Sequence, residues 1–343
     1  PSAFRRSGQD GVLQADLNGL QLSYGSNSNG SCFFFASHPL SADRGFDNPP
    51  IGLVLNGVTQ TPARWPNLDA ATGRYSWQFI DVGYADGFGI NDTSVARRML
   101  RWNREQDPWI HDYLVYDWAD AWHRPAQIVA KTGGGVSVQL EGKLWRSTVV
   151  GQAKFYGSNL RSELDQPGEW FIDRQNHTLY FMPPNSMDDS SPLFLTQALS
   201  AVHLTGASEI TLRGLTIQHA RGAGVVGDRV DGVRIERCHI SGHGQHGVVL
   251  RGRRSGVDSS TIASTGCSGV WVVGGVAREM TPGEMFATGN QIDTMALWTR
   301  AYQPGVMWQG VGNNYSSNVI RNSPHNCITG GGNANMPFTN DSV

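Results

Sequence analysis

One spacing recurs through the last third of the chain and restricts the folds open to it. Short apolar segments, each led by a small residue, recur at intervals of 23, 23, 22, 36 and 22 residues. An isoleucine lies seven residues before most of these positions. The leading residues are Ala201, Gly224, Gly247, Gly269, Gly305 and Cys327, and the isoleucines are Ile217, Ile240, Ile262 and Ile320.

A repeat of about 22 residues is too short for a propeller blade or for a pair of stacked helices. It is typical of one coil of a parallel β-helix, in which each coil hydrogen-bonds to the next and buries a continuous apolar column. We expect two short strands in each coil. The long interval contains Ile292, which lies 13 residues before Gly305, so it holds insertions of about eight residues before that strand and about six after it.

The composition agrees with an all-β fold class. The chain has 343 residues, of which 42 are glycine, and only 16% are charged, as in turn-rich β proteins. Residues 1–190 lack the repeat, and we expect a β-sandwich-like domain there, with a hairpin at 169–182 and a helix near Ser94–Arg101 capped by Thr93 or Ser94. Residues 191–343 form the β-helix, which stops within a coil and so looks incomplete at its C-terminal end.

Several classes of partner are disfavoured. The net charge of −2 indicates no nucleic-acid partner, and the absence of an apolar run of 18 residues excludes a membrane-spanning helix. The four cysteines form no CxxC pair, so we expect no zinc site, and nothing indicates any other metal or cofactor. Buried free thiols are favoured for these cysteines, with a disulfide as the open alternative.

Five motifs in a fixed order resemble those of a known group of proteins. They are Asn56-Gly57, Ala63–Asn67, Tyr116–Asp120, Ala301–Gly305 and Ser323–Asn326. The chain resembles secreted right-handed parallel β-helix (pectin-lyase-like) proteins, which include glycoside hydrolases similar to the fucosidase and xylanase type. The resemblance implies a right-handed β-helix, an inserted N-terminal β-rich domain, an extracellular location and a polysaccharide partner.

A column of charged residues is the first candidate site. Arg213, Glu236 and Asp258 each lie eleven residues before a leading position and alternate with apolar residues, so they should face outward on successive coils. Neighbouring coils are about 4.8 Å apart. Glu236 and Asp258 would then be near the separation of about 5–5.5 Å that retaining glycosidases use. A surface ladder of charges is the competing interpretation.

The long interval contributes the second candidate site. Asp293 follows Ile292, while Trp298, Arg300 and Tyr302 occupy the insertion before Gly305. An acid, a guanidinium and two aromatic rings are side chains that bind sugars by stacking and by hydrogen bonds. His325, in the next coil, should lie one strand spacing away. Asp293 and His325 are therefore candidate catalytic residues, with Trp298, Arg300 and Tyr302 as substrate-binding residues, and a structural role for the Tyr302 loop is the alternative.

Histidines in the turns between strands form the third candidate. His243 and His246 lie in a glycine-rich turn, where stacking could gather them at one rim to bind substrate. Solvated turn histidines are the alternative interpretation. Tryptophans are also frequent in the first domain, where they line a carbohydrate cleft or pack in the core. They are Trp65, Trp102, Trp109, Trp118, Trp122 and Trp145.

Three functions remain open at this point. The favoured one is a secreted glycoside hydrolase that acts on an extracellular polysaccharide by paired carboxylates. The alternative is a non-catalytic extracellular protein that binds polysaccharide or builds a filament, with self-association through the exposed ends of the β-helix. A polysaccharide lyase or epimerase ranks third, because those enzymes often need a basic side chain and the chain has no lysine after Lys154.

Overall fold

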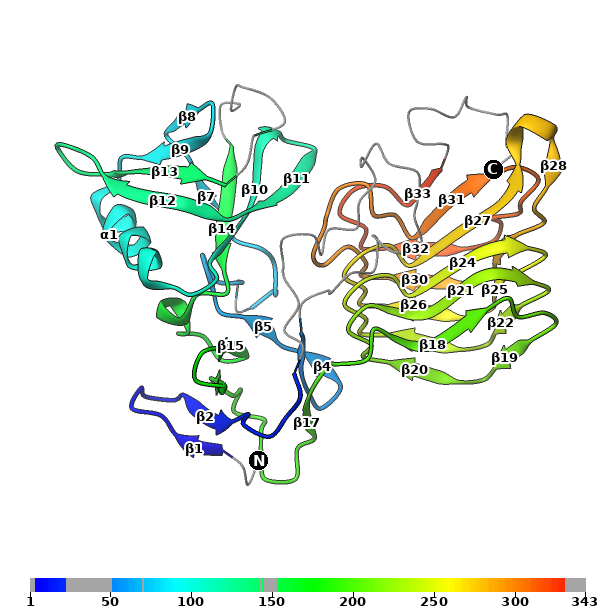
Figure 1. The fold of residues 1–343 in the computed structure, drawn as a ribbon, viewed down its shortest axis with the longest axis horizontal. Helices are drawn as coiled ribbons and strands as arrows, with labels where there is room; N and C mark the ends of the chain where they lie inside the picture. The colour runs from blue at the N-terminus through cyan, green and yellow to red at the C-terminus, as the bar shows by residue number, and fades with distance from the viewer. Residues whose placement is uncertain (1–3, 23–50, 70, 142–143, 145–152, 331–343) are drawn as a thin grey trace. The chain divides into compact units, whose positions relative to one another are not determined.

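The computed structural model describes residues 4–22, 51–69, 71–141, 144 and 153–330 (Figure 1). The chain divides into two units, with one boundary between Phe194 and Leu195. Among the described residues, the first unit contains 4–22 and 53–194, and the second contains 195–330 with Ile51 and Gly52. The sequence placed the division at residue 190, inside the polar segment that precedes the structural boundary.

The first unit is built mainly from antiparallel sheets. One has the order β1 (Phe4–Arg6), β2 (Leu13–Asp16), β16 (Thr178–Phe181), β15 (Glu169–Asp173) and β5 (Thr61–Pro62). A second has the order β11 (Ala119–His123), β10 (Trp109–Tyr116), β14 (Lys154–Ser158) and β6 (Arg64–Trp65), with β7 (Gln78–Phe79) also paired to β14. Two smaller sheets have the orders β12 (Pro125–Ala130), β13 (Val136–Leu140), β9 (Gly87–Ile90), β8 (Val82–Tyr84), and β17 (Leu193–Leu195), β3 (Leu53–Leu55), β4 (Val58–Thr59).

The hairpin and the helix predicted for this unit are both present. The hairpin is confirmed, because β15 and β16 pair antiparallel. The helix α1 (Thr93–Arg101) is confirmed as well, but its cap is Asp92, whose carboxylate accepts hydrogen bonds from the backbone of Ser94 and Val95. Asp92 satisfies two of the free N–H groups at the helix start, which Thr93 or Ser94 was expected to do. Short 3-10 turns complete the helical content: η2 (Trp102–Arg104), η3 (Arg161–Glu163) and, in the second unit, η4 (Ala277–Glu279).

The second unit contains three parallel sheets in its described part (Figure 1). The first has the order β18 (Ser200–Thr205), β21 (Ala223–Asp231), β24 (Val248–Arg253), β27 (Val270–Val276), β31 (Val306–Gly310) and β33 (Ile328–Gly330). The second has the order β19 (Thr211–Arg213), β22 (Arg234–Glu236), β25 (Gly256–Asp258) and β29 (Phe286–Thr288). The third has the order β20 (Thr216–Gln218), β23 (His239–Ser241), β26 (Thr261–Ala263), β30 (Gln291–Asp293) and β32 (Val319–Arg321).

The register of these sheets follows the predicted repeat, because residues one repeat apart are strand partners. Ile217, Ile240, Ile262, Ile292 and Ile320 are successive partners in the third sheet. In the first sheet the successive partners are Val202, Val225, Val248, Val270, Val306 and Ile328. The repeats that begin at β18, β21, β24 and β27 each supply three strands rather than the two expected, because the segment that carries the outward charges forms a sheet of its own, while the repeat that begins at β31 supplies β31 and β32.

The two insertions in the long interval lie at the positions that residue counting predicted, one before the strand of Ile292 and one after it. Val257 pairs with Ala287, and Ile262 with Ile292, so the extra residues of the first insertion precede β29. They form η4 and β28 (Thr281–Pro282), which pairs antiparallel with β27. The second insertion lengthens the turn between β30 and β31, which carries the second candidate site.

An apolar column fills the interior of the second unit. Its members include Val225, Val248, Val270 and Ile262, all fully or almost fully buried. Val249 lies on the opposite face of its strand, in a separate buried cluster with Trp271. Side chains alternate along a strand, so the apolar triplet at 248–250 sends only Val248 and Leu250 inward.

Candidate functional site

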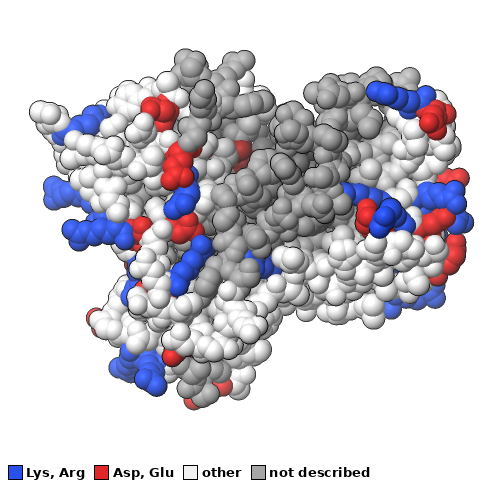
Figure 2. Space-filling view, in the orientation of Figure 1, with Lys and Arg blue, Asp and Glu red and all other residues white. Residues whose placement is uncertain are grey.

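The predicted column of charges exists in the second sheet of the second unit. Arg213 pairs with Glu236, and Glu236 pairs with Asp258. Arg213 donates to the Glu236 carboxylate at 2.7 and 2.9 Å, and Arg234 donates to it at 2.7 Å. Figure 2 shows acidic and basic side chains intermixed on the visible surface of this unit, which lies on the right of the view.

These contacts determine the protonation state of Glu236. Hydrogen bonds from Arg234 and then Arg213 lower the pKa of Glu236 below its ordinary value. The carboxylate is therefore ionised at neutral pH and unsuited to donate a proton. Asp258 accepts hydrogen bonds from Thr288 at 2.7 Å and from Ser259 at 2.9 Å. Glu236 and Asp258 are thus register partners on neighbouring strands, and Glu236 has the ion pairing of a surface ladder.

Asp293 occupies the end of β30, at the start of the long turn. Its Oδ1 atom accepts hydrogen bonds from Thr294 Oγ1 at 2.7 Å and from Asn322 Nδ2 at 2.8 Å. These bonds, that of Thr294 first, lower the pKa of Asp293 below its ordinary value. Thr294 adjoins it in sequence, while Asn322 follows β32 on the neighbouring strand. Asp293 is thus a half-buried, ionised carboxylate held by two neutral donors.

Tyr302 and His325 meet as the sequence suggested. Their ring centroids are 4.8 Å apart in an edge-on arrangement, and the Tyr302 backbone N–H donates to His325 Nδ1 at 3.3 Å. Since Nδ1 accepts this hydrogen bond, the neutral imidazole carries its proton on Nε2. His325 is exposed, so this N–H group can meet a ligand.

Trp298 and Arg300 complete the long turn, and both are half-buried. The Trp298 backbone N–H donates to the Gly266 carbonyl at 2.9 Å. The Trp298 ring lies so close to Gly266 that a Cβ there would be 2.5 Å from its Cδ1 atom. Glycine at this position lets the insertion pack against the preceding repeat, which holds one edge of the turn in place.

His243 is a structural histidine, and the expected solvated or ligand-binding rim is wrong for it. The side chain is 2% exposed. Its Nδ1 accepts from the Ala220 backbone at 3.0 Å, and its Nε2 lies 3.1 Å from the Ile217 carbonyl. Burial lowers the pKa of His243 to about 4, so the ring is neutral at physiological pH. The polar atoms of His243 thus lie against the backbone of the preceding repeat.

His246 is also buried, contrary to the same expectation. It is 3% exposed, and its ring centroid lies 5.3 Å from that of Trp271. Burial first, and then the nearby positive charge of Arg251, lower the pKa of His246 to about 3. The residue forms part of the packing on the outer face of the first sheet, because Trp271 covers it.

The neutral state of His243 predicts a pH dependence of stability. Its pKa is about 4 in the folded protein against an ordinary value of 6.5, so the unfolded chain binds more protons between these values. Stability from this residue is present above pH 6.5 and is lost as the pH falls, by about 2 kcal/mol at pH 5. Urea unfolding at pH 7 and pH 5 should show a loss smaller by about that amount in His243→Gln. The exposed histidine variant His239→Gln is the control, and equal losses in wild type and His243→Gln would contradict the assignment.

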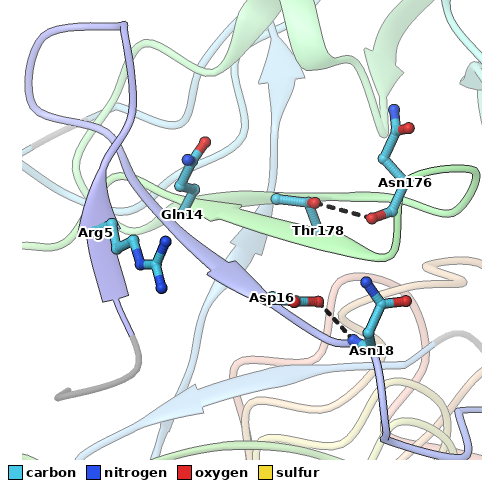
Figure 3. Close-up of a pocket in the computed structure, with 6 residues that line it drawn as sticks. All are labelled: Arg5, Gln14, Asp16, Asn18, Asn176 and Thr178. Atoms are coloured by element: carbon cyan, nitrogen blue, oxygen red, sulfur yellow. Dashed lines mark hydrogen bonds between the residues drawn. The ribbon is translucent and has the colours of Figure 1, made fainter.

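A polar hollow of about 370 Å³ lies on the first sheet of the first unit (Figure 3). Asp16 accepts a hydrogen bond from the Asn18 backbone at 2.7 Å, and Thr178 donates to the Asn176 carbonyl at 3.0 Å. Asp16, Asn18 and Asn176 are all exposed, and we assign the hollow no ligand. Its lining residues are Arg5, Gln14, Asp16, Asn18, Asn176 and Thr178.

The structure also shows two histidine–carboxylate pairs that the sequence prediction missed. His111 Nε2 lies 2.6 Å from Asp120 Oδ2, and His123 Nδ1 lies 2.7 Å from Asp112 Oδ2. Burial alone lowers the pKa of His123, but the Asp112 carboxylate outweighs burial and the pKa is raised. The available signal was a histidine and an aspartate in each of two neighbouring strands, His111 and Asp112 in β10 and Asp120 and His123 in β11. Of the tryptophans expected to line a carbohydrate cleft or to pack in the core, Trp102 and Trp109 are buried and Trp118 is exposed, while Trp145 lies outside the described residues.

Among the described residues, histidine, cysteine, aspartate and glutamate side chains form no group of three that could hold a metal ion. Within the same residues, no helix is both long and apolar enough to cross a membrane.

Comparisons with known proteins add little beyond similarity in shape. No protein-family model matches the sequence, and no curated protein matches it. A solved structure described as a glycoside hydrolase aligns at a TM-score of 0.48 with 12% identity, covering 94% of this chain and 81% of the other. The catalytic domain of a GH87 alpha-1,3-glucanase in complex with tetrasaccharides aligns at a TM-score of 0.15 with 9% identity, covering 82% and 69%. At these scores, neither similarity determines the fold or the activity of this chain.

Proposed function

We propose that the protein is a secreted carbohydrate-active enzyme of the glycoside hydrolase type. Its second unit is proposed to be a right-handed parallel β-helix, and its first unit a sandwich-like β-rich domain. Three parallel sheets that share one repeat support the β-helix. Such a stack offers a long regular surface that suits an extended polysaccharide. The observation that carries the functional proposal is the ionised Asp293 at the start of the long turn. The same turn carries Tyr302, which contacts His325 of the next repeat.

Each of these residues has a role in the proposed reaction. Asp293 is the ionised carboxylate that serves as base or nucleophile. His325 donates a hydrogen bond from its Nε2–H group to the departing sugar oxygen, which takes up its proton from water. Trp298 and Tyr302 stack on pyranose rings, and Arg300 binds hydroxyl or carboxylate groups.

Glu236 and Asp258 form the alternative catalytic centre. Their strands are neighbours in register, which suits a pair of carboxylates at the spacing of a retaining enzyme. In that case the ionised Glu236 acts as nucleophile and Asp258 as acid and base. The two arginines bound to Glu236 support its ionised state but also reduce its reactivity, so this centre ranks second.

A non-catalytic polysaccharide-binding or filament protein is the second candidate function. The ion pairing of Glu236 favours it, since a ladder of paired charges needs no catalytic role. A lyase or epimerase ranks third, because no lysine follows residue 154. A screen of extracellular polysaccharides separates the three functions. Reducing ends without ultraviolet absorbance indicate hydrolysis, absorbance from unsaturated sugars indicates a lyase, and binding without turnover indicates the non-catalytic protein.

The proposed secretion rests on cysteine chemistry. Cys267 is disulfide-bonded, whereas Cys238 is a buried free thiol and Cys327 an exposed free thiol. The preference for free thiols at all of these positions is therefore wrong for Cys267, where the repeat spacing gave no sign of a bond. Disulfides persist mainly in oxidising compartments.

The cysteine assignment makes a direct prediction for alkylation. In denaturant without a reductant, Cys238 and Cys327 should react with iodoacetamide and Cys267 should not. After reduction, Cys267 should react as well, and peptide mass spectrometry reads out each site. Alkylation of Cys267 in denatured, unreduced protein would contradict the disulfide.

A further inference from the structure

The outer face of the third sheet of the second unit places an acid and an arginine on neighbouring strands. Asp293 in β30 is the register partner of Arg321 in β32 and, on its other side, of Ala263 in β26. Ile292 and Ile320 pack in the apolar column, and side chains alternate along a strand, so the residues that follow them point outward. Neighbouring strands are about 4.8 Å apart. The two charged side chains therefore start from adjacent positions on one face.

Arg321 does not pair with Asp293, although the equivalent pair in the second sheet does. Arg213 and Glu236 are register partners in the same way, and Arg213 donates to the Glu236 carboxylate at 2.7 and 2.9 Å. Among the described residues, Arg321 forms no ion pair and donates no side-chain hydrogen bond. Its guanidinium group therefore keeps all of its donors for another partner.

Two neutral groups hold the Asp293 carboxylate instead. Thr294 Oγ1 and Asn322 Nδ2 both donate to its Oδ1 atom, at 2.7 and 2.8 Å. In the part of the chain that the structure describes, Oδ2 accepts no hydrogen bond, so it can approach a sugar. Arg321 acts on Asp293 only through its charge, which is the weakest of the three influences that lower the pKa of Asp293.

The face around these groups is open to solvent. Arg321 and Asn322 are exposed, and Asp293 and Ala263 are half-buried. An ionised carboxylate repels a second anion placed beside it, and a nearby positive charge offsets that repulsion. The planar fork of an arginine binds a carboxylate by two parallel hydrogen bonds. Arg321 thus presents an open carboxylate-binding group directly beside Asp293.

We propose that Arg321 selects an acidic polysaccharide, in which the sugar unit beside the cleaved bond carries a carboxylate group. That carboxylate pairs with the Arg321 fork, while the glycosidic bond lies over Asp293 Oδ2. On the opposite side of Asp293, Ala263 offers no charge, so the sugar unit there needs none. Arg321 is a specificity-determining residue and takes no part in bond cleavage. The inference rests on the proposed function, because it takes Asp293 as the carboxylate at the reaction centre.

Calorimetric titration tests this role by comparing acidic hexamers with their own methyl esters, which have the same sugars and linkages but no charge. The acids are hexamers of galacturonate, mannuronate and glucuronate. Wild type, or Asp293→Asn wherever wild type cleaves the probe, should bind at least one acid about tenfold more tightly than its ester. The affinity for that acid should fall as salt rises. Adding Arg321→Met should weaken binding of the acid about tenfold and leave the ester unchanged, so that the preference disappears.

A second arginine supplies the matched control. Arg278 in η4 is exposed and forms no ion pair in the described structure, so Arg278→Met should keep the wild-type preference for the acid. Arg321→Met should keep the wild-type melting temperature, because the side chain it replaces is exposed. Wild-type protein without a preference for any of the three acids would overturn the proposal. So would an Arg321→Met variant that weakens acid and ester equally or keeps the preference.

The same measurements separate this inference from the proposed hydrolase activity. Hydrolysis of a neutral polysaccharide, without any preference for the acidic hexamers, would overturn the role of Arg321 and leave the proposed activity standing. A preference for an acidic hexamer that depends on Arg321, without hydrolysis of any polysaccharide, would support acidic-sugar recognition by Arg321 and refute the hydrolase.

Discussion

Replacing Asp293 by asparagine is expected to lower polysaccharide hydrolysis by about 10²- to 10⁴-fold, because the amide cannot take up a proton or attack the sugar. The substitution keeps the size of the side chain and an oxygen that accepts from Thr294 and Asn322. The melting temperature should therefore change little. The measurement is kcat/KM on the polysaccharide that wild type cleaves fastest, with thermal unfolding monitored by circular dichroism.

Parallel variants locate the catalytic centre. His325→Gln should lose activity with Asp293→Asn, whereas Asp231→Asn, which removes an exposed carboxylate paired with Arg253 and Arg254, should retain it. Loss of activity in Glu236→Gln, with full activity in Asp293→Asn, would move the centre to the charged column. Full activity in Asp293→Asn, Glu236→Gln and Asp258→Asn would remove both assignments.

Replacing Ile262 by aspartate is expected to unfold the second unit. Ile262 is fully buried and lies between Ile240 and Ile292 in the third sheet. An unpaired carboxylate in this apolar column costs several kcal/mol, comparable with the whole stability of about 5–15 kcal/mol of a typical domain. Circular dichroism should show loss of strand signal at 25 °C, and limited proteolysis should cut within residues 195–330.

The neighbouring residue supplies the control for this prediction. Thr261 is half-buried and, because side chains alternate, points to the other face of β26. Thr261→Asp should lower stability by no more than about 1 kcal/mol, within the range of surface substitutions. A wild-type melting temperature in Ile262→Asp would show that the column does not form the core.

The repeat predicted far more of the second unit than of the first. Parallel strands one repeat apart must be in register, so counting residues correctly paired Ile240 with Ile262 and Glu236 with Asp258. The same counting located both insertions in the long interval. Counting could not tell on which face of its strand Val249 lies, because a run of apolar residues hides the alternation that distinguishes the two faces.

Only some of the contacts at the candidate sites could be predicted from the sequence. The contact between Tyr302 and His325 followed from their places in successive repeats. The burial of His243 did not, since a glycine-rich turn looks the same in sequence whether its side chains point to solvent or to the backbone of the preceding repeat. The pair of His111 and Asp120 was missed because the first unit has no repeat from which to count.

Local spacing in the sequence thus set which residues of the second unit pair across neighbouring strands, because backbone hydrogen bonds between parallel strands tolerate only one register for a given repeat length. The partners of each polar side chain, by contrast, were determined by the tertiary structure. Whether a carboxylate met an arginine, a hydroxyl group or an aromatic ring depended on the side chains that other strands brought to it, and those contacts set both its pKa and its access to solvent.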